Sequence, residues 1–338
     1  LKRVVITGAG VVSPFGLGVK PLFENLWQGN SAVCRISGWE NIQGLSSHIA
    51  APVPSFDSRK MLSRSSRRTA GPMGIYAMLA AREAVDEAGI SDSFLQSGQV
   101  GVIAGSTTGS ADAYEGFYSK YMPEKKLDEI KSGEFFKIMG HSCSANISLF
   151  LGVRGEQWAP VSACTSSSQA IGLGYLLIQA GRQQAMLCGG ADEAHSSVTG
   201  VFDLLRAASC NNQNPKEACR PFDRDRDGVV CGGGSGILVL EELESARSRG
   251  ARIYGEIVGF GNVTDSGHIA NPDKGSMIRA MDNALKEASV TADDIDYINA
   301  HATGTEQGDV AEAEAIETAI NKDVPVSTIK GHLGHMLG

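Results

Sequence analysis

Cys164 lies between an apolar run and a helical pattern in the segment 158–172, WAPVSACTSSSQAIG. A thiol at a helix N-terminus faces unpaired N–H groups and the positive end of the helix dipole, which lower its pKa and favour the thiolate. Small neighbours leave the sulfur accessible, so this context predicts a nucleophile. An arbitrary intracellular cysteine is more often buried and inert, and we expect a structural role for the other six: Cys34, Cys143, Cys188, Cys210, Cys219 and Cys231.

Two histidines lie where predicted strands end. His301 lies in NAHATGT at 299–305, and His335 ends STIKGHLGH at 327–335, five residues after Lys330. Taken alone, each is as compatible with a structural histidine or a solvated loop as with a functional one. Taken with a thiol, two imidazoles from separate strand ends would give a nucleophile with bases or N–H donors beside it. Sequence alone does not show that the three converge.

The elements that would position these residues alternate along the chain. Apolar runs rich in β-branched residues at 4–6, 100–103 and 237–240 predict buried strands. Ala-rich stretches at 73–88, 168–181, 277–288 and 309–320 predict helices between or beside them. This alternation indicates an α/β fold. Many of the 41 glycines follow strand runs, so several turns must approach another part of the chain closely.

One internal similarity suggests a duplication. Residues 81–109 and 281–305 both contain an amphipathic helical pattern, an acidic connection, a strand pattern and a turn of small residues. Two unrelated α/β units can match this loosely by chance. If the repeat is real, the chain has two similar halves, which we place at 1–250 and 251–338.

Composition narrows the functional classes. The chain has 338 residues, is 42% hydrophobic and carries a formal net charge of −8, which disfavours a general nucleic-acid role. Seven scattered cysteines without paired CxxC units suit a reducing compartment. No run of about eighteen apolar residues is present, and the N-terminal LKRVVITGAG predicts a strand instead of a signal peptide. We therefore expect a cytoplasmic protein that does not bind membranes.

Three motif matches fail on their chemistry. The run 223–228, DRDRDG, resembles the start of a calcium loop, but its twelfth position is Gly234 instead of a bidentate Glu. Gly8 and Gly10 follow a strand but lack the third glycine and spaced acid of a dinucleotide site. His332 and His335 have no apparent third metal ligand. We expect neither a metal nor a nicotinamide cofactor.

Four blocks together resemble one known family. They are VSACTSSSQAIG around Cys164, NAHATGT around His301, KGHLGH ending at His335, and CRPFDRDRDGVVCGGGSGILVLEE at 219–242. They resemble, in order and over the whole chain, the signatures of elongating β-ketoacyl-acyl carrier protein synthases. The resemblance implies a thiolase-like fold, with duplicated halves in a layered α-β-α-β-α arrangement, and a homodimer.

The resemblance also implies a reaction and a role for each matching residue. Cys164 would take an acyl chain from the phosphopantetheine of an acyl carrier protein, and the enzyme itself would need no cofactor. His301 and His335 would hold the malonyl thioester carbonyl during decarboxylation, because two N–H donors stabilise the enolate-like charge. Lys330 would tune the electrostatics and Glu312 would support the site structurally. Thr303 and Thr305 would bind the pantetheine arm.

Further positions follow from the same family resemblance. Thr108, in the turn 105–109, would line the acyl pocket. An acidic carrier protein would dock on basic residues despite the negative total charge, although a solvated basic helix end remains the alternative. The densest basic run comprises Arg59, Lys60, Arg64, Arg67 and Arg68. Arg206 falls at another docking position of the family, and the docking candidates are Arg64, Arg67, Arg68 and Arg206.

Related classes differ at single positions. Initiating synthases usually have Asn in place of His335, and thiolases usually have a second Cys there. Chain-length partners of polyketide synthases usually lack the equivalent of Cys164, yet a catalytically silent partner in a heterodimer stays the main alternative. Acyl length and pathway, fatty acid or polyketide, are left open.

Two features depart from the family. Gly233 stands where a Glu is usual, and its consequence is open. The sequence stops at Gly338, three residues after His335, whereas family members continue through a further helix and strands. We therefore expect the second half to be truncated.

Overall fold

A mixed seven-stranded sheet forms the centre of the molecule in the computed structural model, which describes residues 1–122, 124–267 and 271–338. The strand order is β2-β1-β8-β7-β5-β6, and β9 also pairs with β1. Strand β5 is parallel to β6 and β7, whereas β8 is antiparallel to β1 and β7. The strands are β1 (Val4–Ser13), β2 (Gly16–Leu17), β5 (Val100–Gly105), β6 (Gln157–Trp158), β7 (Ala185–Asp192), β8 (Gly234–Glu242) and β9 (Gly255–Ile257).

Helices cover both faces of this sheet because its central strands are apolar on both sides. Every residue of β5 and β7 is buried, as expected for strands whose sequences are continuous apolar runs. Helices α3 (Pro72–Ala88) and α7 (Ser142–Leu151) pack on one face through a core rich in alanine. Helix α8 (Ser166–Gln179) packs on the opposite face. The helices predicted at 73–88 and 168–181 are thereby confirmed within two residues.

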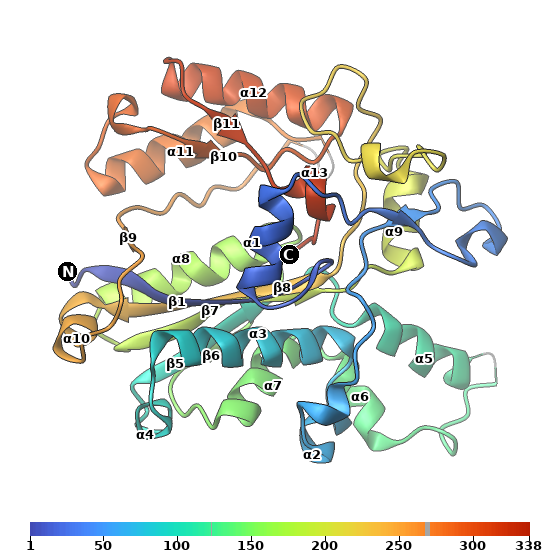
Figure 1. Ribbon diagram of the computed structural model, residues 1–338, viewed down its shortest axis with the longest axis horizontal. Helices are drawn as coiled ribbons and strands as arrows, with labels where there is room; N and C mark the ends of the chain where they lie inside the picture. Colours follow the sequence, from blue (N-terminus) through green and yellow to red (C-terminus); the bar gives the residue numbers. More distant parts are fainter. Residues whose placement is uncertain (123, 268–270) are drawn as a thin grey trace.

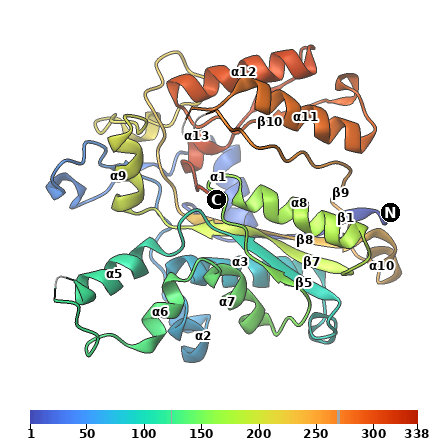
Figure 2. The ribbon, with the colours of Figure 1, turned by 180° about the vertical axis from the view of Figure 1, so that it is seen from behind.

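The second part of the chain lies beyond α8. Helices α11 (Lys274–Ala288) and α12 (Glu306–Ile320) pack together over the parallel pair β10 (Ile298–Asn299) and β11 (Val326–Ser327). Figure 1 and Figure 2 show the resulting layers: α11 and α12, then β10 and β11, then α8, then the large sheet, then α3 and α7. This is the expected α-β-α-β-α order, and the helices predicted at 277–288 and 309–320 are confirmed.

In the first half, two glycines of β1 let the strand touch helix α3. A Cβ placed on Gly8 would lie 2.3 Å from the carbonyl oxygen of Ala84, and one on Gly10 would lie 1.9 Å from that of Ala80. Such distances are far below van der Waals contact, so only glycine permits this approach. The glycines that follow the first apolar run therefore serve helix–strand packing, not phosphate binding.

The second half repeats this contact. A Cβ on Gly259 would lie 2.3 Å from the carbonyl oxygen of Ala284, and one on Gly261 would lie 1.9 Å from that of Ala280. Both alanines belong to α11, and each is 200 residues beyond its counterpart on α3 (284 − 84 and 280 − 80). The same offset relates residues 81 and 281 in the repeat predicted from sequence.

A backbone-to-carboxylate bond accompanies the contact in each half. The backbone N–H of Ala9 donates to Glu87 (2.7 Å), and that of Phe260 donates to Glu287 (3.1 Å). Two halves that share glycines, alanines and a carboxylate in one arrangement confirm the duplicated fold. The boundary between 250 and 251 stays a prediction.

The two halves meet through α8. A Cβ on Gly172 would lie 2.3 Å from the ring of Phe260, so only the absence of a side chain at Gly172 lets the phenylalanine ring pack directly on the helix backbone. The remaining elements are β3 (Cys34–Arg35), β4 (Ile49–Ala50), α1 (Val19–Trp27), α2 (Arg64–Arg68), α4 (Asp92–Leu95), α5 (Ala111–Tyr121), α6 (Ser132–Ile138), α9 (Ser196–Leu204), α10 (Leu243–Ser248), α13 (Lys330–Leu333) and 3-10 turns at 39–41, 58–60, 215–217 and 292–294. Among the residues described, no helix combines the length and apolarity that crossing a membrane would need.

The repeated glycine contact predicts matched losses of stability. Gly10→Ala and Gly261→Ala should each lower the free energy of unfolding by about 1–3 kcal/mol, because the added methyl group must displace helix backbone. Gly255→Ala is the control, since a Cβ there meets nothing within 4 Å, and it should stay within about 0.5 kcal/mol of the parent. Denaturant unfolding measures all three, and an unchanged Gly10→Ala variant would contradict this packing.

Candidate active site

Cys164 stands on a strained turn that leads from β6 into α8. Ala163, just before it, has a left-handed φ of +49°, which is costly for a residue with a Cβ. The turn is held by the hydroxyl of Ser166, which accepts from the N–H of Ser162 (2.9 Å) and donates to the carbonyl of Ala163 (2.8 Å). This geometry leaves Cys164 partly exposed two residues before the helix begins.

His301 follows β10 on a loop that helix α12 holds from behind. The carboxylate of Glu312 accepts the N–H of His301 and the N–H of Ala302, each at 2.6 Å. Ala302 has a left-handed φ of +32°, so the bonds to Glu312 hold the backbone in an unfavourable conformation. On the same loop the hydroxyls of Thr303 and Thr305 bond to each other (3.1 Å).

The segment at 219–242 anchors the far side of the His301 loop. The buried carboxylate of Asp309 accepts the N–H of Phe222 (2.7 Å) and of Gly304 (3.0 Å) and lies 3.6 Å from Arg226. The guanidinium of Arg226 in turn donates to the carbonyl oxygens of Thr305 (3.1 Å) and Glu306 (2.6 Å). The fourth sequence block therefore positions the loop of the second block.

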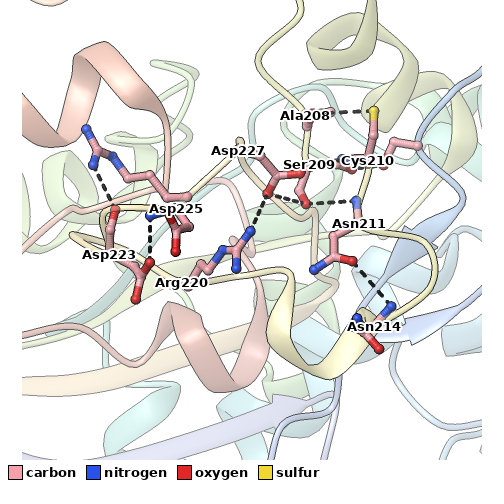
Figure 3. A network of polar contacts seen from close by, with 11 residues as sticks. Ala208, Ser209, Cys210, Asn211, Asn214, Arg220, Asp223, Asp225 and Asp227 are labelled. Carbon is pink, nitrogen blue, oxygen red and sulfur yellow. Dashed lines mark hydrogen bonds and ion pairs between the residues drawn. The ribbon is translucent and has the colours of Figure 1, made fainter.

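The acidic run at 223–227 does not gather its carboxylates (Figure 3). Asp223 accepts the N–H of Asp225 (2.7 Å), whereas Asp227 accepts the hydroxyl of Ser209 (2.8 Å) and lies 3.9 Å from Arg220. Carboxylates turned toward different partners form no oxygen cage for calcium. The side chains of this run form hydrogen bonds within their own turn and to the neighbouring loop at Ser209.

His335 is fixed by backbone bonds on both sides. Its N–H donates to the carbonyl of Val230 (2.7 Å), and its carbonyl accepts the N–H of Gly232 (2.8 Å). The N–H of Leu337 points at Nδ1 of the imidazole (3.3 Å). Because Nδ1 accepts that bond, the neutral ring carries its proton on Nε2. His335 is 3% exposed.

The three side chains converge. Nε2 of His335 lies 3.0 Å from Sγ of Cys164, and the rings of His301 and His335 are 5.2 Å apart and nearly perpendicular, at 89°. One sulfur and one ring nitrogen from each histidine all lie within 4.8 Å of one another. A pocket of about 880 Å³ adjoins them, and its lining includes Lys330 and Glu312.

The same three groups are soft metal ligands, but the tautomer of His335 opposes a metal. A ligating histidine normally donates its second N–H to an acceptor. Here Nδ1 faces a donor, the N–H of Leu337, so Nε2 bears the proton and offers no lone pair. His332 is separate, since its Nδ1 bonds to the backbone oxygen of Asn30 (2.8 Å).

The pKa of the Cys164 thiol differs from the sequence prediction. Burial raises it, and the nearby carboxylate of Asp192 raises it further, while the positive charge of Lys330 acts in the opposite direction. The net shift is upward, so the lowered pKa expected from a helix N-terminus is wrong for this site. The thiolate is the minor form at neutral pH, and Nε2–H of His335 is placed to stabilise it.

Both imidazoles are neutral near pH 7. The surrounding protein, assisted by the charge of Lys330, lowers the pKa of His301 to about 4. Burial, His301 and Lys330 lower the pKa of His335 well below its ordinary value. Burial also lowers the pKa of Lys330, and Glu312 opposes that shift. The site thus presents neutral N–H donors beside a sulfur.

Other predicted site residues lie further out. Thr303, Thr305 and Thr108 are not among the residues that line the pocket, and Thr108 is exposed on its turn. Arg64 and Arg68 are exposed on α2, whereas Arg67 is half-buried and donates to the carbonyl of Leu62.

Arg206 is exposed just after α9. Figures 1 and 2 both show α9 well apart from α2. The two groups of docking candidates therefore do not form one patch within this chain.

Gly233, where the family usually has Glu, leaves no room for a side chain. A Cβ there would lie 2.8 Å from the backbone nitrogen of Ala194.

Sequence reasoning missed two neighbouring carboxylates, Asp192 and Glu193, which are buried at the end of β7. Their only signal was a pair of acids at the end of an apolar run.

Layers of this order, with a thiol and two imidazoles at the junction of the halves, define a thiolase-like acyltransferase. The family model "Beta-ketoacyl synthase, N-terminal domain" matches residues 1–246, and "Beta-ketoacyl synthase, C-terminal domain" matches residues 254–338. The chain therefore belongs to the β-ketoacyl synthase family.

Relatives match over the whole chain. The 3-oxoacyl-[acyl-carrier-protein] synthase 2 of Vibrio harveyi is 35% identical over 345 residues, which is 100% of this chain and 82% of the relative. A solved β-ketoacyl synthase from Burkholderia phymatum STM815 has a TM-score of 0.96 and 39% identity, covering 100% of this chain and 83% of that one.

Two solved polyketide-type relatives are also similar. The ishigamide ketosynthase/chain length factor has a TM-score of 0.92 and 32% identity, covering 100% of this chain and 82% of that one. The complex AntDE:AntF, a type II polyketide synthase acyl carrier protein with its ketosynthase bound to the hexaketide, has a TM-score of 0.89 and 29% identity, with coverages of 99% and 82%.

Lys330 should control the reactivity of the thiol. Lys330→Met removes the cation that lowers the pKa of Cys164, so less thiolate exists at pH 8 and alkylation of Cys164 by iodoacetamide should slow by about two- to tenfold. Peptide mass mapping of the alkylated cysteine against time and pH measures this rate. Lys286→Met, an exposed change on α11, is the control and should leave the rate unchanged. Faster alkylation in Lys330→Met would contradict the assigned electrostatics.

Proposed function

We propose that this chain catalyses decarboxylative condensation of a malonyl-carrier protein with an acyl chain held on Cys164, giving a β-ketoacyl-carrier protein. The observation that carries the proposal is the convergence of one thiol and two neutral imidazoles within 4.8 Å. That geometry gives a nucleophile and two N–H donors, which are the groups that acyl transfer and thioester decarboxylation need.

The first step is acyl transfer. The thiolate of Cys164 attacks the thioester carbonyl of the acyl-carrier protein, an S–C bond to Cys164 forms, and the S–C bond to the pantetheine breaks. The proton given up by Cys164 ends on the departing pantetheine sulfur. Nε2–H of His335, 3.0 Å from Sγ, stabilises the thiolate before attack.

The second step is decarboxylation. The malonyl thioester loses carbon dioxide, and the electron pair of the broken bond passes into an enolate whose charge sits on the thioester oxygen. His301 and His335 donate N–H hydrogen bonds to that oxygen. Because their rings are neutral, they stabilise the charge without transferring a proton to the oxygen. One such donor contributes about 10²–10³ in kcat in comparable sites.

The third step forms the carbon–carbon bond. The enolate carbon attacks the acyl thioester on Cys164, the C–S bond breaks, and the thiolate of Cys164 is regenerated and takes up a proton from solvent water. Lys330 moderates the charge of that thiolate, and Glu312 holds the His301 loop during both steps. Thr303 and Thr305, on the same loop, are the proposed contacts of the pantetheine arm, and Thr108 that of the acyl chain.

The partner is an acyl carrier protein that brings its own phosphopantetheine, so the enzyme carries no cofactor of its own. The similar AntDE:AntF complex, in which an acyl carrier protein is bound to its ketosynthase, supports this partner. Arg64, Arg67, Arg68 and Arg206 stay the proposed contacts of an acidic carrier. We place the reaction in the cytoplasm, without nucleic acid or membrane, as one step of a fatty acid or polyketide pathway.

Acyl transfer can be observed directly. Incubation with an acyl-carrier protein should add the mass of one acyl group to the wild-type chain, and that mass should map to Cys164. Cys164→Ala should lose both the adduct and condensation, because the thiol that lies beside both imidazoles is gone. Cys210→Ala, at an exposed cysteine, is the control and should keep both. Docking of the carrier protein without acyl transfer would instead indicate a silent chain-length partner.

The edge of the large sheet supports a dimer. Strand β6 pairs only with β5 in the described part of the chain, and Trp158 on it, Val161 after it and Leu149 of the neighbouring α7 are exposed. An unpaired edge with apolar side chains is a ready site for another strand. We propose that a second copy of this chain occupies it; a chain-length partner would use the same edge.

The edge predicts a matched pair of variants. Trp158→Lys should convert the dimer to a monomer in light scattering coupled to size exclusion, because a charge would then be buried at the interface. Trp27→Lys alters a more exposed tryptophan on α1, away from this edge, and should leave the dimer intact. Dissociation by both variants, or by Trp27→Lys alone, would contradict this placement.

A further inference from the structure

Asp192 connects three segments that meet at the site. It is the last residue of β7 and is 1% exposed. Its carboxylate accepts the hydroxyl of Ser106 (2.6 Å), the N–H of Thr107 (3.0 Å) and the N–H of Gly338 (2.7 Å). Two of these donors belong to the turn that precedes Thr108, and the third belongs to the segment that follows His335.

Each bonded segment continues to a functional group. The hydroxyl of Ser106 also accepts the N–H of Gly109 (2.9 Å), so the whole turn is fixed through Asp192. The carbonyl of Gly338 accepts the N–H of Ser167 (2.8 Å), in the first turn of α8. Cys164 lies three residues before Ser167. One carboxylate therefore holds the turn at 106–109 and the His335 segment, and through Gly338 it is linked to the start of α8.

Burial raises the pKa of Asp192 itself, while the bonds from Ser106, Thr107 and Gly338 favour its ionised form. The ionised carboxylate also acts on the sulfur. It raises the pKa of Cys164, as it does those of the buried Cys143 from α7 and Cys231 beside His335. The other titratable groups near Cys164 include the cation of Lys330, the two neutral imidazoles and the thiol of Cys231. The carboxylate and the ammonium thus act on the thiol with opposite sign.

We infer that Asp192 is a positioning residue that couples the turn at 106–109, which carries the proposed acyl contact Thr108, to the nucleophile. Its hydrogen bonds set where the turn and the His335 segment lie. The role of the turn as an acyl contact rests on the proposed function. The first measurement, alkylation of Cys164, needs no substrate.

The variant Asp192→Asn distinguishes this positioning role from a purely structural one. Loss of the negative charge should move the pH profile of Cys164 alkylation to lower pH, with an about two- to tenfold faster rate at pH 8. Loss of one acceptor should lower the free energy of unfolding measurably. Glu193→Gln is the matched control: its carboxylate holds Met73, Ser110 and Asp112 instead, so it should cost stability and leave the alkylation profile unchanged.

Asp192→Glu tests the positional part. The charge is kept, so the alkylation profile should stay near that of the parent, while acyl transfer from the carrier protein should slow at least about tenfold because the turn is displaced. Parent-like acyl transfer in Asp192→Glu, or a parent-like alkylation profile in folded Asp192→Asn, would overturn the inference. If the variants show these alkylation shifts but the parent shows no acyl transfer, the result would instead count against the proposed function alone.

Discussion

The site depends on two hydrogen bonds in which the carboxylate of Glu312 accepts the N–H groups of His301 and Ala302. Reactive side chains stand on loops, and loops leave backbone N–H groups without sheet or helix partners. In this fold carboxylates fill that need, as Asp309 does for Gly304 and Asp192 does for Thr107. Charged acceptors form bonds roughly twice as strong as neutral ones, which is sufficient to hold residues such as Ala302 at a positive φ.

This solution sets the electrostatics of the reaction. Burial and the carboxylate of Asp192 raise the cost of a thiolate at Cys164, and Lys330 offsets part of that cost. Both imidazoles remain neutral because burial and the same lysine oppose their protonation. The site therefore relies on N–H donors aimed at developing negative charge, and not on a thiol that is ionised at rest. Support of the loops and control of the thiol are two consequences of one arrangement.

Sequence predicted the elements and the chemistry better than the geometry. The apolar strands and Ala-rich helices followed from local patterns, and the repeat at residues 81 and 281 was visible because both halves pack the same small residues. The convergence of Cys164 with His335 was not visible, since 171 positions separate them and only the fold closes that distance. The strain at Ala163 leaves no trace in composition. The thiol pKa was predicted in the wrong direction because a local rule for helix ends cannot account for burial or for a distant Asp192.

The central claim is that the two imidazoles perform decarboxylation while the thiol carries the acyl chain. Release of carbon dioxide from a malonyl-carrier protein in the absence of any acyl donor tests this most directly. Cys164→Ala should still release carbon dioxide although it cannot condense, whereas folded His335→Ala should lose about 10²–10³ of the rate through the missing donor. Decarboxylation that disappears with Cys164 but survives the loss of His335 would contradict the account.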